Sequence, residues 1–176
     1  MVENKGPVLA TRRQMLAGIA IGSLAVRSTA WGQTPQAMPE APSTAANQTR
    51  TALHQEVEFA ASPQRLYHVL LTSKQFAGFT GLAARIDPKA GGAFTLFGGL
   101  VGGRNVELIA NQRIVQAWRP ALWDAGLYSL VRFELKPQGT GTNLVLDHTA
   151  FPEGEFDALT AGWPVRYWEP LKKFLA

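Results

Sequence analysis

The sequence contains no cysteine and few charged residues, and both shortages limit what it can do. The missing cysteines exclude disulfide bonds, thiolate metal ligands, cysteine nucleophiles and iron–sulfur clusters. Charged residues make up 17% of the chain and hydrophobic residues 46%, which is typical of a globular protein. Residues 31–176 hold 13 Lys and Arg against 12 Asp and Glu, so most of the net charge of +4 lies before them. A nearly neutral domain lacks the basic face that nucleic-acid binding requires, and we expect no nucleic-acid partner.

A stretch of about 20 apolar residues, as a membrane-spanning helix needs, is also missing near the N-terminus. Residues 14–26 are uncharged and mostly apolar, but 13 helical residues reach only about 20 Å. This length is typical of the apolar region of a signal peptide. Arg12 and Arg13, followed by Gln-Met-Leu, resemble the bacterial twin-arginine export motif, and small residues lead up to Ala30.

We therefore predict a twin-arginine signal peptide over residues 1–30, cleaved after Ala30, and a periplasmic or otherwise exported protein. An uncleaved segment would instead act as an anchor, and this is the one membrane contact we expect. A short buried helix is a further alternative. Residues 31–50 combine three prolines with polar residues and predict a flexible linker, which leaves residues 51–176 for the folded domain.

The domain begins with alternating apolar residues over 52–59, as in a half-buried strand. Ser62 and Pro63 then predict the start of a helix over 63–71, and Thr72 or Ser73 can cap a second helix that reaches Phe79. Six further strands are expected at residues 82–86, 93–97, 104–110, 113–119, 127–136 and 142–150. We interpret the glycine-rich residues 98–103 as a hairpin turn rather than a phosphate-binding loop, because strands flank them on both sides.

A helix is expected from about Glu155 to the end of the chain. Trp163, Tyr167, Leu171 and Phe174 recur on one side of it, with a break near Pro164 and a kink at Pro170. An antiparallel sheet with one apolar face needs a cover, and this helix is the only expected element long and apolar enough to supply it. The sequence therefore predicts an α+β fold in which a curved sheet of six to seven strands wraps around a long C-terminal helix.

Several runs resemble the C-terminal domain of activators of the heat-shock-protein-ninety ATPase and their bacterial homologues. They are ASPQRLY (residues 61–67), GGAFTLFGG (91–99), IVQAWR (114–119) and GWPVRYWEPLKK (162–173). The resemblance covers nearly all of residues 51–176. It implies the helix-grip fold of the START-like (Bet v-like, SRPBCC) superfamily, with two short helices after the first strand. In eukaryotic members it implies a co-chaperone role that is shared with a separate N-terminal domain.

Aromatic residues on the expected strands and final helix are candidates for a ligand cavity between sheet and helix, although plain core packing also explains them. They are Phe94, Phe97, Trp118, Tyr128, Phe133, Trp163 and Tyr167. The three histidines lack the spacing of a zinc site, and we interpret His148 as a surface or edge histidine whose side chain points away from that of Asp147. We expect no metal, no cofactor and no catalytic residue.

Three functions remain open. The first is a non-enzymatic module that binds a small hydrophobic ligand in the sheet–helix cavity. The second is a protein-interaction or co-chaperone-like module without such a cavity. The third is a cavity-based cyclase or hydrolase, which would need a polar cluster deep inside the domain.

Overall fold

A computed structural model describes residues 50–176, and these form one unit with its own core. The predicted signal peptide and nearly all of the predicted linker lie outside the described residues. Within residues 50–176, no helix is long and apolar enough to cross a membrane. The element order agrees with the prediction: one strand, two short helices, six strands and a long C-terminal helical segment.

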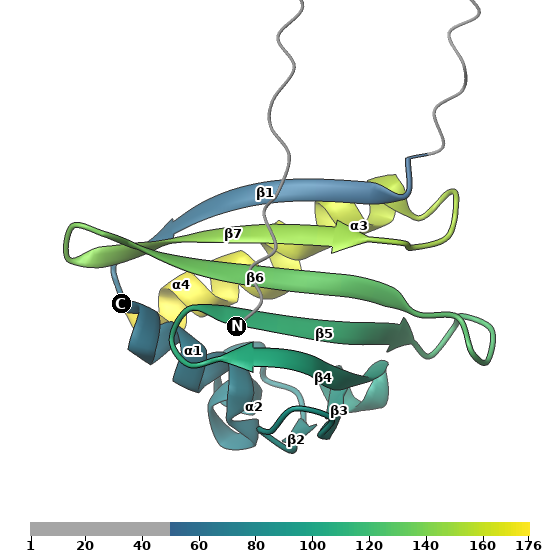
Figure 1. Cartoon of the computed structure of the whole chain (residues 1–176), viewed down its shortest axis with the longest axis horizontal. Coiled ribbons are helices and arrows are strands. Elements are labelled where there is room, and N and C mark those ends of the chain that lie inside the picture. Colours follow the sequence, from purple (N-terminus) through teal and green to yellow (C-terminus); the bar gives the residue numbers. More distant parts are fainter. Residues whose placement is uncertain (1–49) are drawn as a thin grey trace, which may run out of the picture. The chain divides into compact units, whose positions relative to one another are not determined.

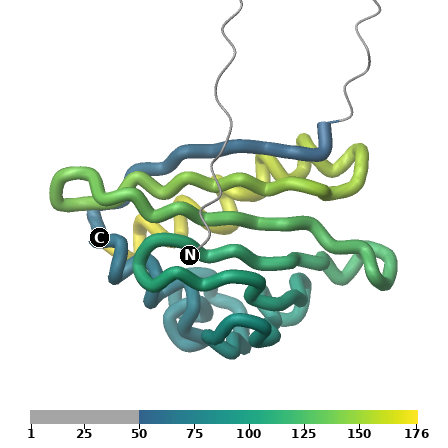
Figure 2. Tube along the Cα trace, in the orientation of Figure 1, coloured from purple at the N-terminus to yellow at the C-terminus, as the bar shows by residue number. Residues whose placement is uncertain are grey.

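Seven strands form a single antiparallel sheet in the order β1-β7-β6-β5-β4-β3-β2 (Figure 1). Their bounds are Ala52–Phe59 (β1), Arg85–Ile86 (β2), Ala93–Leu96 (β3), Val101–Ile109 (β4), Arg113–Pro120 (β5), Ser129–Gln138 (β6) and Gly141–Thr149 (β7). Short hairpins join most neighbouring strands, as the tube in Figure 2 shows, so chain order and sheet order largely coincide. The predicted strand over 82–86 is shorter than expected, because only two of its residues pair with β3.

The two short helices, α1 (Pro63–Leu71) and α2 (Ser73–Thr80), lie where the sequence places them. Ser62 caps α1, since its hydroxyl accepts a hydrogen bond from the Arg65 backbone amide at 3.3 Å. Neither Thr72 nor Ser73 caps α2 with its side chain. The Ser73 hydroxyl accepts from the Ile86 amide at 2.9 Å, and so ties α2 to the end of the sheet instead.

The predicted glycine-rich turn over 98–103 is too long. The turn is the 3-10 segment η1 (Phe97–Gly99) with Leu100, and Gly102 and Gly103 belong to β4. A β-carbon at Gly103 would lie 2.1 Å from the Ala117 carbonyl oxygen and 2.4 Å from the Phe94 ring. Glycine therefore serves close packing at this position, and not only the turn.

The C-terminal segment consists of α3 (Phe156–Trp163), the π-helical turn η2 (Pro164–Trp168) and α4 (Glu169–Leu175). The widened turn η2 stands where we expected a break and a kink. Its closing bond joins the Glu169 amide to the Pro164 carbonyl, five residues back. Pro170 has no amide hydrogen to continue a regular ladder, and the wider turn gives its ring more room.

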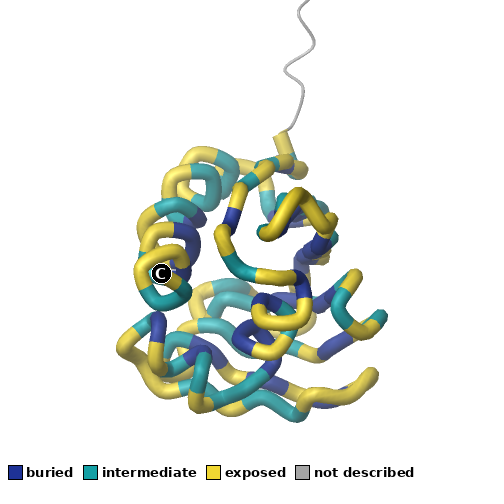
Figure 3. Tube along the Cα trace, turned by 90° about the vertical axis from the view of Figure 1, so that its left-hand side faces the viewer, coloured by how far each residue is buried: buried dark blue, intermediate teal, exposed yellow. Residues whose placement is uncertain are grey.

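This segment runs behind the sheet in Figure 1 and packs its apolar side against it. The predicted stripe is confirmed, since Trp163, Tyr167 and Leu171 are buried and Phe174 is half-buried. Figure 3 shows that the segment turns its buried residues toward the domain and its exposed residues outward. The core therefore lies between one face of the sheet and the helices, as the helix-grip prediction requires.

Candidate functional site

The space between the sheet and the C-terminal helix is occupied by stacked aromatic side chains. The Trp163 ring lies 5.2 Å from that of Trp118 on β5 and 5.1 Å from that of Trp168, with ring centroids as the reference points. The Tyr167 ring stacks on Phe133 of β6 at 5.9 Å. Such pairs add to the free energy gained by burying the rings, so this cluster fixes the helix on the sheet.

Five of the seven predicted cavity residues meet in this region and are buried, namely Phe94, Trp118, Phe133, Trp163 and Tyr167. Phe97 is half-buried and packs its ring against those of Phe76 and Tyr167. Tyr128 does not join them, because it lies in the loop after β5 with 48% of its surface exposed. The Tyr167 hydroxyl is enclosed by the core, and this burial raises the pKa of Tyr167 well above its ordinary value.

Two hollows of the described domain lie outside the space between Trp118 and Trp163, although Phe94, one of the predicted cavity residues, contributes to the wall of the first. One, of about 530 Å³, opens between α2 and the β2–β3 hairpin, where Ser73, Arg85 and Phe94 contribute to its wall. The other, of about 280 Å³, lies near the β6–β7 hairpin between Glu58 and Gln138. A ligand cavity beneath the C-terminal helix therefore stays a prediction, and aromatic side chains occupy the region where we expected it.

His148 is buried, which corrects the interpretation of it as a surface or edge histidine. It is 1% exposed, and its imidazole bridges the sheet and the helix. The Trp163 indole donates to its Nδ1 at 3.3 Å, and its Nε2 lies 2.7 Å from the hydroxyl of Ser129. The Ser129 hydroxyl lies 3.4 Å from the carbonyl oxygen of Trp118 and can donate to it. The two side chains point to opposite faces of β7, as predicted from strand alternation, with Asp147 toward solvent and His148 toward the core.

A serine beside a histidine can form a nucleophile and its base, but this pair has the wrong proton arrangement. An indole nitrogen can only donate, so Nδ1 of His148 must accept from Trp163. Nε2 of the neutral ring then carries the proton and donates to Ser129, and has no lone pair to receive a proton from it. Burial also lowers the pKa of His148 to about 4, which keeps the ring neutral.

A second buried chain of polar groups starts at the same aromatic cluster. The Trp118 indole donates to Gln116 at 2.9 Å, and the Gln116 amide donates to Asn105 at 2.8 Å. Asn105 lies at a register shift in β4 and donates to the Asp87 carbonyl oxygen at 2.8 Å. These bonds satisfy three buried polar side chains and attach the turn before β3 to the sheet.

The solvent face of the sheet carries a continuous chain of ion pairs. Arg113 contacts Glu107 at 2.8 Å and Glu134 at 3.4 Å, so it joins β4, β5 and β6. Arg132 on β6 contacts Asp147 on β7 at 2.7 Å, and Asp147 also binds His54 on β1 at 2.7 Å. Arg132 therefore lies in a salt bridge at the surface of the sheet.

Within this chain of ion pairs, the pKa of Asp147 is lowered and that of His54 is raised, as expected for paired opposite charges. Partial burial raises the pKa of Asp147, but hydrogen bonds from His54 and Arg132 outweigh it and lower the pKa overall. The hydrogen bond to Asp147 raises the pKa of His54. The charges of this face are therefore largely satisfied within the sheet.

The two ends of the domain differ in chemistry. Where β1 ends, Arg65, Lys172 and Lys173 are exposed, and we call this group the basic end. The Arg65 guanidinium lies 5.8 Å from the Phe174 ring, and the Lys172 ammonium 5.8 Å from the Phe59 ring. No ion pair found among residues 50–176 involves these three side chains.

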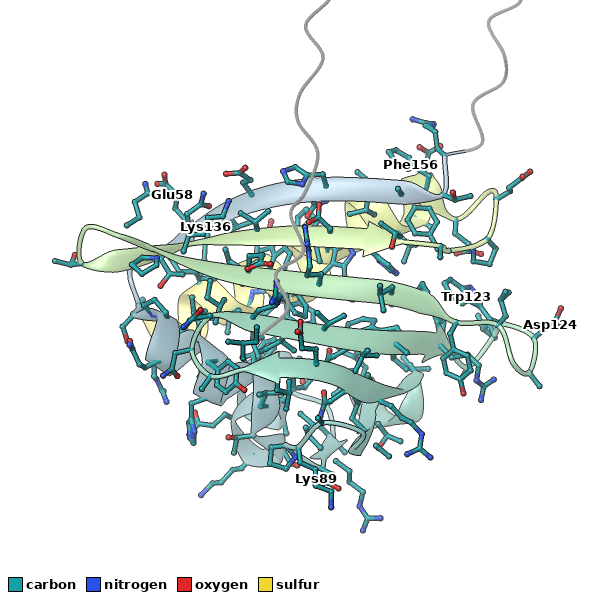
Figure 4. All side chains as sticks on the ribbon, viewed as in Figure 1. Glu58, Lys89, Trp123, Asp124, Lys136 and Phe156 are labelled. Carbon is teal, nitrogen blue, oxygen red and sulfur yellow. The ribbon has the colours of Figure 1, made fainter. Side chains whose placement is uncertain are left out.

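The opposite end of the sheet exposes several apolar side chains, next to the acidic residues Asp124, Glu153 and Asp157. Leu100, Leu122, Leu127 and Tyr128 are exposed there, and we call this group the apolar end. The Ala121 amide donates to the Leu100 carbonyl at 2.8 Å, which holds the loop after β5 beside η1. Figure 4 places Trp123 and Asp124 of this loop at the other end of the sheet from Glu58 and Lys136.

Sequence reasoning missed the buried polar groups and both ends. Alternation along β5 places Gln116 on the face of Trp118, and alternation along β7 places His148 on the face of Leu144 and Leu146, so the inward direction of both could have been predicted. Nothing local in the sequence identifies Ser129 and Trp163 as the partners of His148, because strand pairing and helix docking bring them together.

His148 predicts a specific dependence of stability on pH. The folded group has a pKa of about 4 and the unfolded group one near 6.5, so the unfolded chain binds the extra proton between these values. Stability should therefore fall as the pH drops through this window, by at most about 3 kcal/mol. In urea unfolding between pH 7 and pH 4.5, His148→Gln should show a flatter pH dependence than the unsubstituted chain.

The exposed His68 on α1 provides the matched control, and His68→Gln should keep the original pH dependence. Only the slope with pH is compared, so a general loss of stability in His148→Gln does not affect the result. Equal slopes for the two variants would contradict a buried, neutral His148.

Comparison with known proteins identifies the family. The model of the family "Activator of Hsp90 ATPase homolog 1-like protein" matches residues 60–176. An activator of 90 kDa heat shock protein ATPase homolog from Dictyostelium discoideum is 32% identical over 116 residues, which are 65% of this chain and 30% of that protein. Homolog 1 from Homo sapiens is 28% identical over 115 residues, which are 65% of this chain and 34% of the human protein. The chain thus spans about a third of the length of these relatives.

Solved structures agree on the fold. An HSP90 activator from Plasmodium falciparum has a TM-score of 0.68 at 24% identity, over 71% of this chain and 96% of that one. The Aha1 dimer from Colwellia psychrerythraea has a TM-score of 0.60 at 19% identity, over 70% and 95% of the two chains. At these identities the likeness extends to the fold alone, whereas the family model covers most of the described domain. The chain belongs to the family of activator of Hsp90 ATPase homolog 1-like proteins.

Proposed function

We propose that residues 50–176 form a non-enzymatic protein-binding module whose partner is an ATP-driven chaperone of the 90 kDa heat-shock class. The observation that carries this proposal is that aromatic side chains fill the space between the sheet and the C-terminal helix. Aromatic rings of Trp118, Trp163 and Trp168 occupy the region that a small ligand would need, so binding is left to the surface. The names of the relatives, as activators of that ATPase, supply the class of partner.

The basic end is the surface best suited to such a partner. Most charges along the open face of the sheet are engaged in ion pairs within the sheet, such as that between Arg132 and Asp147, whereas Lys136 makes no ion pair within 4 Å among residues 50–176. Lys172 and Lys173 instead point into solvent from α4, and Glu169 on the same helix makes no ion pair with them within 4 Å among the described residues. Unpaired cations at a surface raise the rate of association with an acidic partner and favour its binding.

We further propose that the chain is exported by the twin-arginine route. Arg12 and Arg13, the apolar residues 14–26 and the small residues that lead up to Ala30 support a signal peptide. Because this route usually carries proteins that are already folded, the domain would fold in the cytoplasm. It could then meet a cytosolic chaperone before export, which reconciles the two proposals.

Charge reversal at the basic end tests the proposed function. We expect the full chain to bind a purified bacterial 90 kDa heat-shock ATPase and to change its ATP turnover by about twofold or more. Lys172→Glu with Lys173→Glu should weaken this binding by about tenfold, which corresponds to roughly 1.4 kcal/mol. Lys89→Glu with Arg104→Glu, which reverses two exposed cations on the β3 side of the sheet, is the matched control and should bind normally.

Native mass spectrometry of the same preparation separates this proposal from ligand binding. We expect the mass of the protein alone. A co-purified apolar molecule, together with no effect on the ATPase, would replace the chaperone partner with a small hydrophobic ligand.

Export is tested in a bacterium with an intact twin-arginine pathway. The full chain should appear in the periplasm, with a mature N-terminus at Trp31. Replacing both Arg12 and Arg13 with lysine should leave the precursor in the cytoplasm, whereas Arg27→Lys should be exported normally. Periplasmic protein at an unchanged level in the double variant would rule out this route.

A further inference from the structure

Several large hydrophobic side chains are exposed at the apolar end, and no packing within the described domain covers them. Leu122 is 97% exposed, and Leu127 and Tyr128 follow it in a loop, residues 121–128, whose one charged residue is Asp124. Leu100, 55% exposed, lies beside this loop through the bond between its carbonyl and the Ala121 amide. Exposed apolar side chains gathered in this way mark a surface that contacts a protein or a membrane.

The described chain begins at this same end. Ala52, Thr149, Leu130 and Ala117 form one line of paired residues across β1, β7, β6 and β5. The loop of residues 121–128 lies just beyond that line, and so does Arg50, whose guanidinium is 4.1 Å from the Phe156 ring. Figure 4 shows Phe156 and Trp123 at the same end of the sheet. The chain that leads back to the apolar residues 14–26 therefore leaves the domain at the same end of the sheet as the exposed leucines, with β7 and β6 between them.

We propose that the apolar end contacts the surface of a lipid bilayer while residues 14–26 hold the chain there. The 23 residues between that segment and Arg50 reach at most about 80 Å when fully extended, so the domain stays near the membrane. Leu122 occupies an exposed position in the loop. Trp123 and Tyr128 each combine an aromatic ring with one polar group, and such side chains are enriched at membrane–water interfaces.

The charge distribution defines what kind of membrane contact this is. The helices α1 and α4, which carry Arg65, Lys172 and Lys173, lie toward the other end of the sheet from the loop (Figure 1). At the apolar end itself the exposed charges are Arg50 and the acidic Asp124, Glu153 and Asp157, so the contact is made by apolar side chains and gains nothing from anionic lipids. A few leucines alone give only a weak and reversible attachment, as one short acyl chain does, and stable binding needs a second attachment. Residues 14–26 supply it, so the contact should end once the signal peptide is removed.

The cysteine-free chain allows this contact to be measured at single positions. An environment-sensitive dye is attached to Leu122→Cys in the full chain, and to Val106→Cys on β4 as the control, because Val106 is also exposed, at 54%. Both are added to vesicles of phosphatidylcholine, with or without phosphatidylglycerol. At position 122 we expect a blue shift of the dye emission and quenching by brominated lipid. We expect neither effect at position 106, and the same result for both lipid compositions.

Three outcomes would overturn the proposal. The dye at position 122 could stay in water while the chain floats with the vesicles, which would mean that residues 14–26 bind alone. Both dyes could respond equally, which would mean that the domain adsorbs without preference. The dye at position 122 could instead respond to the 90 kDa ATPase and not to vesicles, which would assign the apolar end to a protein. The test of the basic end is independent of all three.

Discussion

The packing of the C-terminal helical segment on one face of the sheet is the contact on which the rest of the structure depends. Trp163 and Trp168 stack at 5.1 Å and an interplanar angle of 17°, and Trp163 reaches Trp118 on β5. The π turn η2 places Tyr167 and Trp168 on adjacent buried positions, which a uniform amphipathic helix does less readily. These large rings fill the space between the sheet and the C-terminal helix, where a protein of similar shape could hold a ligand. Their packing there stabilises the domain instead.

Buried hydrogen bonds determine how that packing is aligned. His148 accepts from the Trp163 indole and donates to Ser129, so one ring connects the helix with two neighbouring strands. Gln116 accepts from the Trp118 indole and continues the chain of bonds toward Asn105. A shift of the helix or of a strand would leave these buried groups without partners, at a cost of about 1–3 kcal/mol each. The polar groups thus favour one arrangement of an otherwise apolar core.

Much of the fold could be predicted from the sequence, because periodicity and turn residues act locally. The alternation over 52–59, the cap at Ser62 and the aromatic stripe from Trp163 to Phe174 each specify an element without distant contacts. The glycine run was harder, since the role of Gly103 depends on the Ala117 carbonyl across the sheet. His148 was misjudged for the same reason: its environment is made by residues that only the tertiary fold brings together. The fold also adds Arg65 to Lys172 and Lys173 at the basic end, and Leu100 to the loop of residues 121–128 at the apolar end.

Aromatic side chains fill the space between the sheet and the C-terminal helix, and most charges of the open face are held in ion pairs, so the two ends are the main surfaces left for recognition. The most direct measurement of that packing is a crystal structure of the protein under xenon pressure, because xenon enters dry apolar cavities. The account predicts no xenon between the sheet and residues 163–171. Xenon or a co-purified apolar molecule bound beneath Trp163 and Tyr167 would contradict it.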